Sequence, residues 1–299
     1  MTDNSILLIG YSADDVILHF RRWLEANKYS YKILCLEETY STNIIQFYSS
    51  ATGYYSCELI NFENELYNCN GIFQRLTMPI SELQFSNIYS ISLHKVIYYY
   101  LVRYKSKIIN HPLVGWENFS KPFQTTQLLR FGFQVPFSFS TTLPNMLERY
   151  SEKFSLIYKS NSGIRSIVNK VSESKSKDIF KLRNCPVFFQ EYIKGCDVRI
   201  HVVNNSTFSI AIKSNEIDYR YDKSENLSFE NISIPNEIRK KCIEYTKKNG
   251  LIFSGFDFKL TSDNRWVCLE MNPMPGFSTY DLHLDFTITK AIYSELMNS

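Results

Sequence analysis

Several features that would assign a function directly are missing from this sequence of 299 residues. Its seven cysteines include no Cys-x-x-Cys pair and its five histidines are scattered, which argues against a disulfide framework and against a Cys/His metal cluster. The formal net charge is only +3, which argues against a nucleic acid or an anionic membrane as partner. These absences leave a globular protein of mixed charge, with 44% apolar residues.

Long apolar segments are also lacking. No uninterrupted apolar run approaches the ~20 residues that span a bilayer, and the N-terminus shows no secretory pattern. The apolar stretch Val96–Val102 is flanked by Lys95 and Arg103, which favours a buried helix. With an odd number of cysteines, the sequence predicts a cytoplasmic protein without a membrane partner, and it leaves a homo-oligomer open.

Glycine is scarce, with 10 residues, and a GxGxxG phosphate loop is absent. The first part of the chain nevertheless reads as strand, helix and strand. The apolar run from Ser5 ends at Gly10, a helix is expected to begin near Ser12, Asp14 and Asp15, and the apolar segment YKILCL follows. This order is typical of a parallel α/β layer.

The middle part predicts a helix followed by a strand and a loop of small polar residues. Ser120 is a suitable helix cap, Pro122 suits the first turn, and Gly132 lies near the expected end. Lys159 ends an apolar strand and is followed at once by the loop 160–163. Backbone N–H groups of such a loop can bind a phosphate beside a lysine, although a hairpin loop with a solvated lysine explains the pattern as well.

The third part holds two apolar strands joined by a short turn, and three polar side chains share one face of this hairpin. With Asp263 and Asn264 at the tip and Ser262 opposite Arg265, Asp257 falls opposite Glu270, and alternation adds Asn272 to the same face. The core side is expected to carry Phe256, Phe258, Leu269 and Met271. Opposed carboxylates destabilise a sheet unless a cation lies between them, and Mg²⁺ prefers oxygen ligands. A solvated, screened hairpin face remains the alternative.

These segments, in this order, resemble an ATP-grasp ligase of the RimK-like branch. The resemblance covers roughly Ser120 to the C-terminus, and its motifs are SKPFQTTQLL, IYKSNSGIRSIV, FFQEYIKGCDVRIHVV and GFDFKL…WVCLEMNPMPGF. It implies an ATP-grasp fold of the α/β and α+β classes. The implied domains are an N-terminal pre-ATP-grasp α/β domain (1–112), a central lid subdomain (113–185) and a C-terminal subdomain with the Mg/ATP site (186–299).

The resemblance also implies roles for individual residues. As cofactors it implies ATP and one or two Mg²⁺ ions, for which Mn²⁺ can substitute. The metal ligands would be Asp257, Glu270 and Asn272; the nucleotide would be bound by Lys121, Lys159, Ser160, Ser162, Gly163, Glu191, Tyr192 and Asp197; Arg199 and Arg220 would act at the γ-phosphate or at the acyl phosphate. In this set Glu191 and the backbone of Tyr192 read the adenine, and Asp197 accepts the ribose hydroxyls.

Structural roles for the same residues stay open at this stage. Lys121 can simply belong to a first helical turn, Asp197 can cap the turn at Gly195, and Arg199 can form a structural ion pair with Asp197 or Glu216. The loop after Lys159 is shorter and poorer in glycine than the usual flap of the family.

Three functions compete for the chain. The first is an ADP-forming ligase that activates a carboxylate as an acyl phosphate and joins it to an amine, with a peptide or protein as the expected acceptor. The second is a macrocyclase of the same superfamily that forms ester or amide cross-links in a ribosomal peptide, for which the acceptor is an amine or a hydroxyl. The third is a degenerate grasp protein that binds nucleotide or peptide without catalysis. The turn Met274–Asp281, with Tyr280, is a candidate substrate edge, whereas His201 is interpreted as a strand residue and Cys196 as a packed thiol.

Overall fold

The computed structural model describes residues 5–36, 43–49, 55–61, 69–76, 95, 97–98, 100–102, 107–161, 169–171, 180–214, 219, 224 and 227–298. Contacts between Cα atoms divide the chain into two compact units. The first unit comprises Met1–Val114, Gly250–Phe253 and Gly276–Ser299, and the second comprises Gly115–Asn249 and Ser254–Pro275. None of the helices in the described residues is long and apolar enough to cross a membrane.

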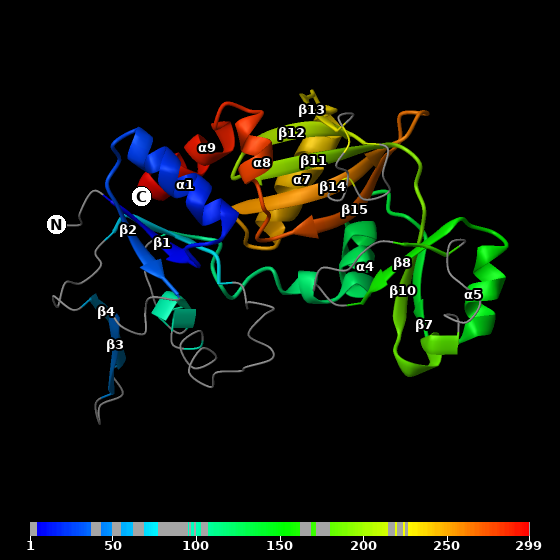
Figure 1. Ribbon diagram of the computed structural model, residues 1–299, viewed down its shortest axis with the longest axis horizontal. Coiled ribbons are helices and arrows are strands. Elements are labelled where there is room, and N and C mark those ends of the chain that lie inside the picture. Colours follow the sequence, from blue (N-terminus) through cyan, green and yellow to red (C-terminus); the bar gives the residue numbers. More distant parts are fainter. Residues whose placement is uncertain are drawn as a thin grey trace. The chain divides into compact units, whose positions relative to one another are not determined.

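The first unit is built on a parallel sheet, as the strand–helix–strand pattern predicts. Its strands lie in the order β2-β1-β5-β6, with the bounds β1 Ile6–Gly10, β2 Tyr31–Cys35, β5 Gly71–Gln74 and β6 Lys107–Ile109. Figure 1 labels β1 and β2 of this sheet. All five residues of β1 are buried, because helices cover both faces of such a sheet and its strands become continuous apolar runs. A separate antiparallel pair is formed by β3 Asn43–Ser49 and β4 Tyr55–Asn61.

Helix α1, Asp15–Ala26, begins where the sequence predicts. The carboxylate of Asp14 accepts hydrogen bonds from the backbone N–H groups of Val16 and Ile17, at 2.9 and 3.3 Å, so Asp14 is the N-cap. The stretch around Val96–Val102 is helical where it is described, and Ile97 and Leu101 are fully buried, which confirms the buried helix.

The end of the chain returns to the first unit, which the sequence reading did not anticipate. Helices α8, Ser278–Leu282, and α9, Thr287–Met297, follow the last strand, and α9 packs against β5 and β6. The contact grouping assigns residues 276–299 to the first unit. The three predicted domains, 1–112, 113–185 and 186–299, stay predictions.

Gly71 marks the close approach of α9 to β5 and supports a first testable prediction. A Cβ atom at this position would lie 2.8 Å from the Leu296 carbonyl oxygen and 2.9 Å from its Cδ2, so we expect Gly71→Ala to destabilise the first unit by roughly 1–3 kcal/mol. Thermal melting checks this, with Gly276→Ala as the control, because a Cβ there meets no atom within 4 Å. Equal melting of the two variants would contradict the packing described here.

The second unit contains two antiparallel sheets. The smaller has the order β7-β10-β8-β9, with the bounds β7 Ser138–Thr141, β10 Val187–Glu191, β8 Leu156–Ser160 and β9 Asn169–Lys170. Helix α5, Pro144–Ser151, packs against β7 and against the 3₁₀ turn η4, Phe180–Asn184. The small core beneath them contains Leu147, Leu156, Leu182 and Phe189.

The larger sheet has the order β13-β12-β11-β14-β15. Its strands are β13 Ser228–Asn231, β12 Ser206–Lys213, β11 Cys196–Val203, β14 Phe253–Leu260 and β15 Trp266–Asn272. Helix α7, Asn236–Lys248, packs against β11 and β12, and Tyr245 of this helix lies against Phe133 and Phe256 in an aromatic core. The opposite face of the sheet is therefore the one left for polar side chains.

Helix α4, Lys121–Phe131, packs against β15 and follows the 3₁₀ turn η2, Trp116–Phe119. Its boundaries confirm the expected capping: the Ser120 hydroxyl accepts the N–H of Phe123 at 3.5 Å, and Gly132 has the left-handed φ of 97°. The buried Gln124 donates to the Met271 carbonyl at 2.6 Å and accepts the Met271 N–H at 3.1 Å. This pair of bonds fixes the start of α4 against the strand that carries Glu270 and Asn272.

Candidate functional site

Asp257 lies opposite Glu270 on the neighbouring strands β14 and β15, as the sequence predicts. The reason is different from the predicted one. The hairpin loop has three residues rather than two: the Thr261 N–H donates to the Arg265 carbonyl at 3.0 Å, and Asn264 takes the left-handed φ of 62°. Continued regularly, this register would place Leu269 opposite Asp257.

A β-bulge restores the predicted pair. The register shifts between Asp257 and Phe258, so Phe258 lies opposite Cys268, and Leu269 is the extra residue. Cys268 is fully buried and Leu269 only partly so, which corrects the expectation that Leu269 belongs to the core face; Phe256, Phe258 and Met271 do lie in the core. The bulge thus keeps Glu270 off the core side and beside Asp257.

The two carboxylates strain each other electrostatically. Burial raises the pKa of Asp257 to about 6, the Arg199 guanidinium opposes this shift, and the charge of Glu270 adds to it. A divalent cation between the two groups would offset the free-energy cost of burying their charges and would reduce their repulsion. The donor set therefore fits Mg²⁺. Among the described residues, no three His, Cys, Asp or Glu side chains are grouped so that they could hold a metal ion, so such a site would use two carboxylates and an amide oxygen.

The amide oxygen belongs to Asn272, and the local backbone orients it. Its Oδ1 accepts the N–H of Met274 at 2.9 Å, which closes the turn at the end of β15 just where the two prolines stop the strand. An amide oxygen has a second lone pair for a ligand. Asn272 is thus held by the chain itself on the strand that carries Glu270.

Arg199 makes a close ion pair with Asp257, a partner that the sequence reading did not consider. Its Nη1 lies 2.6 Å from Asp257 Oδ1, and the arginine side chain is only 7% exposed. The guanidinium lies directly over Gly255, where a Cβ atom would be 2.7 Å from Nη2 and 2.7 Å from the Pro275 side chain. The glycine therefore provides the space that the guanidinium needs.

Asp197 pairs with Lys259, a residue that the sequence reading missed. Lys259 Nζ lies 2.8 Å from Asp197 Oδ1 and 3.4 Å from the Gly195 carbonyl, and both side chains are largely buried. Lys259 is two residues from Asp257 on β14, so strand alternation alone would have placed it on the polar face. Two ion pairs, Asp197–Lys259 and Arg199–Asp257, thus join β11 to β14, and each strand contributes one acid and one base.

The two predicted phosphate-binding lysines are positioned by linked segments. The Lys121 N–H at the start of α4 donates to the Asn161 carbonyl at 3.2 Å, and Asn161 follows directly on Lys159 and Ser160. The Asn161 side chain is fixed in turn, since its Oδ1 accepts from the Ser140 hydroxyl and its Nδ2 donates to the Pro186 carbonyl. Lys159 lies over the Phe188 ring, 5.7 Å from its centroid.

Three predicted site residues, Ser162, Gly163 and Arg220, lie outside the described residues. The roles predicted for all the site residues, including those whose position is described, stay predictions.

Two groups of the predicted adenine hinge form hydrogen bonds within the chain. The Glu191 carboxylate accepts the Phe137 N–H at 3.3 Å, and the Tyr192 N–H donates to the Ser155 carbonyl at 2.7 Å. The Tyr192 N–H is thus occupied within the chain, and the adenine-binding role of this backbone stays a prediction. Lys170, which sequence reasoning did not single out, lies over the Tyr192 ring at 5.2 Å.

The Cys196 thiol is a packed group, as the sequence suggests. Burial raises its pKa, and the neighbouring Asp197 adds to the shift. Its Sγ lies 3.5 Å from the Ile212 carbonyl on the adjacent strand. A thiol kept protonated in this way is a poor nucleophile.

Comparison with known protein families shows the family to which the chain belongs. A sequence profile described as the RimK-like ATP-grasp domain matches residues 139–296, just over half of the chain. The chain belongs to the RimK-like ATP-grasp family.

Solved structures of ATP-grasp enzymes match nearly the whole fold. The ligase PsnB in complex with a minimal precursor is 22% identical and covers 99% of both chains with a TM-score of 0.82. The macrocyclase MdnC from Microcystis aeruginosa MRC, bound to its precursor peptide MdnA, is 20% identical and covers 99% of this chain and all of its own, with a TM-score of 0.78. These likenesses confirm the predicted ATP-grasp fold.

A curated relative gives less information about function. The uncharacterized protein MG012 of Mycoplasma genitalium strain G37 is 24% identical over 178 residues, which span 58% of this chain and 58% of the relative. The match to the family model confirms the predicted RimK-like ATP-grasp relationship.

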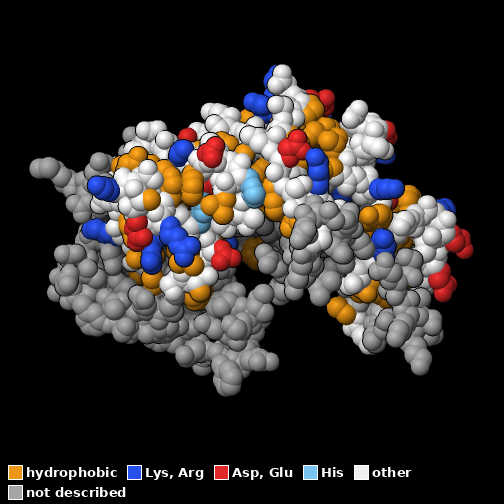
Figure 2. Space-filling model, turned by 45° about the horizontal axis from the view of Figure 1, so that its top comes forward, with side chains coloured by type: hydrophobic (Ala, Val, Ile, Leu, Met, Phe, Trp, Pro, Cys, Tyr) orange, Lys and Arg blue, Asp and Glu red, His pale blue; other side chains and the backbone are white. Residues whose placement is uncertain are grey.

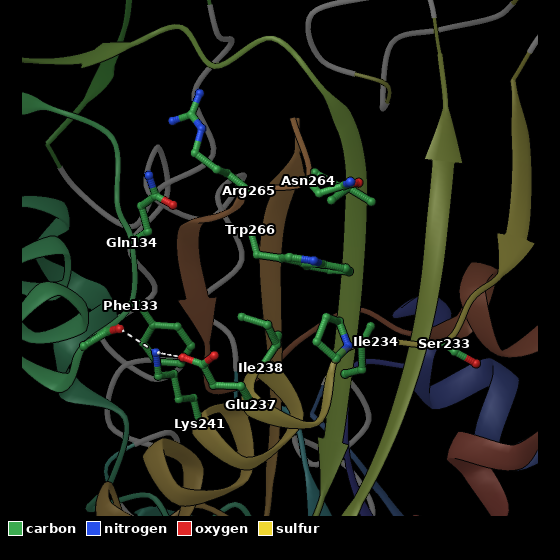
Figure 3. Close-up of a pocket in the computed structure, with 13 residues that line it drawn as sticks. Phe133, Gln134, Ser233, Ile234, Glu237, Ile238, Lys241, Asn264, Arg265 and Trp266 are labelled. Atoms are coloured by element: carbon green, nitrogen blue, oxygen red, sulfur yellow. Dashed lines mark hydrogen bonds and ion pairs between the residues drawn. The ribbon is translucent and has the colours of Figure 1, made fainter. Parts of the chain in front are cut away.

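A cavity of about 750 Å³ in the second unit contains none of the predicted site residues. Figure 3 shows its lining, with Trp266 and Ile238 on the apolar side and the Lys241–Glu237 ion pair of 2.7 Å near the turn after α4. Lys241 Nζ also donates to the Gly132 carbonyl at 2.9 Å. Lys241 thus links helix α7 to that turn.

The surface agrees with the small net charge. On the face shown in Figure 2, the Lys and Arg side chains of the described residues lie interspersed with Asp, Glu and apolar side chains. The expectation that nucleic acid is not a partner stays a prediction.

Proposed function

We propose that the chain is an ATP-dependent ligase that activates a carboxylate as an acyl phosphate and joins it to an amine, with release of ADP and phosphate. The acceptor is a peptide or a protein. The observation that carries this proposal is the paired Asp257 and Glu270, with Arg199 held beside them, on the polar face of the larger sheet. A binding protein without catalysis would have little use for two opposed, partly buried carboxylates.

The residues divide the work as follows. Asp257, Glu270 and Asn272 would hold Mg²⁺, which when bound offsets charge on the transferred phosphoryl group. Lys121 and Lys159 would bind the phosphates, and Asp197 would accept the ribose hydroxyls. Arg199 would place its positive charge at the γ-phosphate and then at the acyl phosphate, so that charge is stabilised without a covalent protein intermediate.

A peptide acceptor is supported by the neighbours in fold. The PsnB, MdnC and Chryseobacterium gregarium ligases were solved in complex with precursor, leader or core peptides. The D-alanine–D-alanine ligase from Bacillus anthracis, which was solved in complex with ATP, matches less well, with a TM-score of 0.59. The same comparison favours a second candidate, a macrocyclase that joins side chains within one peptide.

A single assay tests the proposal and separates the two candidates. The protein is incubated with Mg-ATP and with pooled amino acids, peptides and any precursor peptide encoded nearby, and ADP and AMP are quantified. We expect ADP, not AMP, to form in an acceptor-dependent way. Mass spectrometry of the acceptor then shows the gain of an amino-acid residue for conjugation or the loss of water for cyclisation. If the protein bound Mg-ATP tightly but turned over none of the acceptors, the result would instead favour a grasp protein that binds without catalysis.

A further inference from the structure

His201 contacts Arg199 in the interior of β11. Arg199 Nε lies 3.3 Å from His201 Nε2, and the histidine is 1% exposed. A guanidinium can only donate hydrogen bonds, so Nε2 must be the acceptor and the ring proton must be on Nδ1. His201 is therefore a neutral histidine of defined tautomer, aimed at the side chain proposed for phosphoryl transfer.

The guanidinium is fixed on three sides by different parts of the sheet. Nε donates to His201 of its own strand, Nη1 donates to Asp257 of β14, and Nη2 lies over Gly255, where a Cβ would meet it at 2.7 Å. A hydrogen bond from Nε fixes the rotation of the planar group about its long side chain. Without that bond, the guanidinium would lose the constraint on Nε and keep those on Nη1 and Nη2.

We propose that His201 is a positioning residue for Arg199: its Nε2 acceptor sets the plane in which the guanidinium meets the terminal phosphate of ATP. This inference rests on the proposed function and assigns a role to a buried histidine that the sequence reading treated as an ordinary strand residue. It predicts that loss of the acceptor weakens recognition of the third phosphate while ADP binding is preserved.

The test compares the binding of two nucleotides and needs no acceptor substrate. Dissociation constants for Mg-AMPPNP and Mg-ADP are measured by calorimetry for the wild type and for His201→Phe, His201→Gln and Arg199→Ala. We expect His201→Phe to lower the preference for AMPPNP over ADP by about tenfold, the size of one hydrogen bond to a charged group. His201→Gln, whose amide oxygen can accept from Nε, should restore most of the preference, and Arg199→Ala should abolish it.

A matched control separates positioning from packing. Ile200→Val removes one methyl group from the neighbouring, fully buried position of β11 and should leave the nucleotide preference unchanged. Melting curves with Mg-ADP show that each variant is folded. Nitrogen NMR of the histidine ring in the free protein should show an unprotonated Nε2.

The possible outcomes distinguish a failure of the proposed ligase function from a failure of the positioning role of His201. A wild-type protein that binds neither nucleotide would refute the proposed function and this inference together. A wild-type preference for AMPPNP that is lost in Arg199→Ala but kept in His201→Phe would leave the ligase intact and refute the positioning role. Equal loss in His201→Phe and His201→Gln would also refute it, because the acceptor atom would then not be the feature that matters.

Discussion

Replacing Glu270 with Gln is expected to lower the rate of Mg-ATP-dependent ADP formation on the order of 10²–10³-fold, because one of two paired carboxylates is lost where charge must be stabilised. Asp257→Asn should have a similar effect. The shape of the side chain is kept in both variants, so the loss measures charge rather than packing. ADP release at saturating Mg-ATP is the measurement, and Glu230→Gln, at an exposed acid on the opposite edge of the same sheet, is the control.

The same Glu270→Gln variant should be no less stable than the wild type in the absence of metal. Because the pKa of Asp257 is raised to about 6 in the folded protein, chiefly by burial and in part by Glu270, the folded state binds more protons than the unfolded state between about pH 4 and pH 6. Metal-free wild type should therefore lose stability as the pH rises through this window. Removal of the Glu270 charge should reduce that loss.

Denaturation measured over a range of pH, with and without Mg²⁺, tests the direction of this change in stability. Mg²⁺ should stabilise the wild type above pH 6 and have a much smaller effect on Glu270→Gln. A variant that is both inactive and strongly destabilised would show that Glu270 supports the fold rather than a metal. A fully active variant would contradict the proposed site.

The Asp257–Glu270 pair shows what a sequence can and cannot determine in a strand pair. Alternation and a polar turn suffice to predict that the two acids face each other. The calculation nevertheless assumed a two-residue tip, and it gave the right pair only because a three-residue loop and a bulge at Leu269 compensate each other. A bulge follows from cross-strand packing, which composition and periodicity do not report.

Lys259 and His201 escaped the sequence analysis for a different reason. Lys259 and His201 occur in strands that were predicted, but their importance depends on contacts with Asp197 and Arg199. Such contacts depend on the order of strands in the sheet, in which β11 lies beside β14 although some 50 residues separate them along the chain. Motif matching supplies the family residues, whereas the residues that orient them require the fold.

The turn after β15 includes a buried carboxylate. The stretch Met274–Asp281 stays a candidate substrate edge, and its last residue, Asp281, is fully buried in the first unit. Its carboxylate accepts the N–H groups of Ile288 and Thr289, at 2.8 and 3.2 Å, and also binds the Thr289 hydroxyl. His19 Nε2 of α1 lies 2.9 Å from the same carboxylate.

Asp281→Ala is therefore expected to destabilise the first unit by about 3–5 kcal/mol, since one buried carboxylate satisfies two backbone donors at the start of α9 as well as two side chains. The His19 ring also stacks on Phe286, with 5.2 Å between ring centroids, so the change should loosen α1 and α9 together. Hydrogen exchange of the Ile288 and Thr289 amides reports this local opening directly.

Asp285→Asn in the same turn is the matched control for Asp281→Ala. Asp285 is exposed and has a φ of 51°, a conformation that asparagine adopts readily, so its stability should be close to that of the wild type. If Asp281→Ala exchanged as slowly as the wild type, the buried carboxylate would not be what holds α9 in place. If it exchanged rapidly but still bound Mg-ADP normally, the opening would be confined to the neighbourhood of α9 and would not affect nucleotide binding.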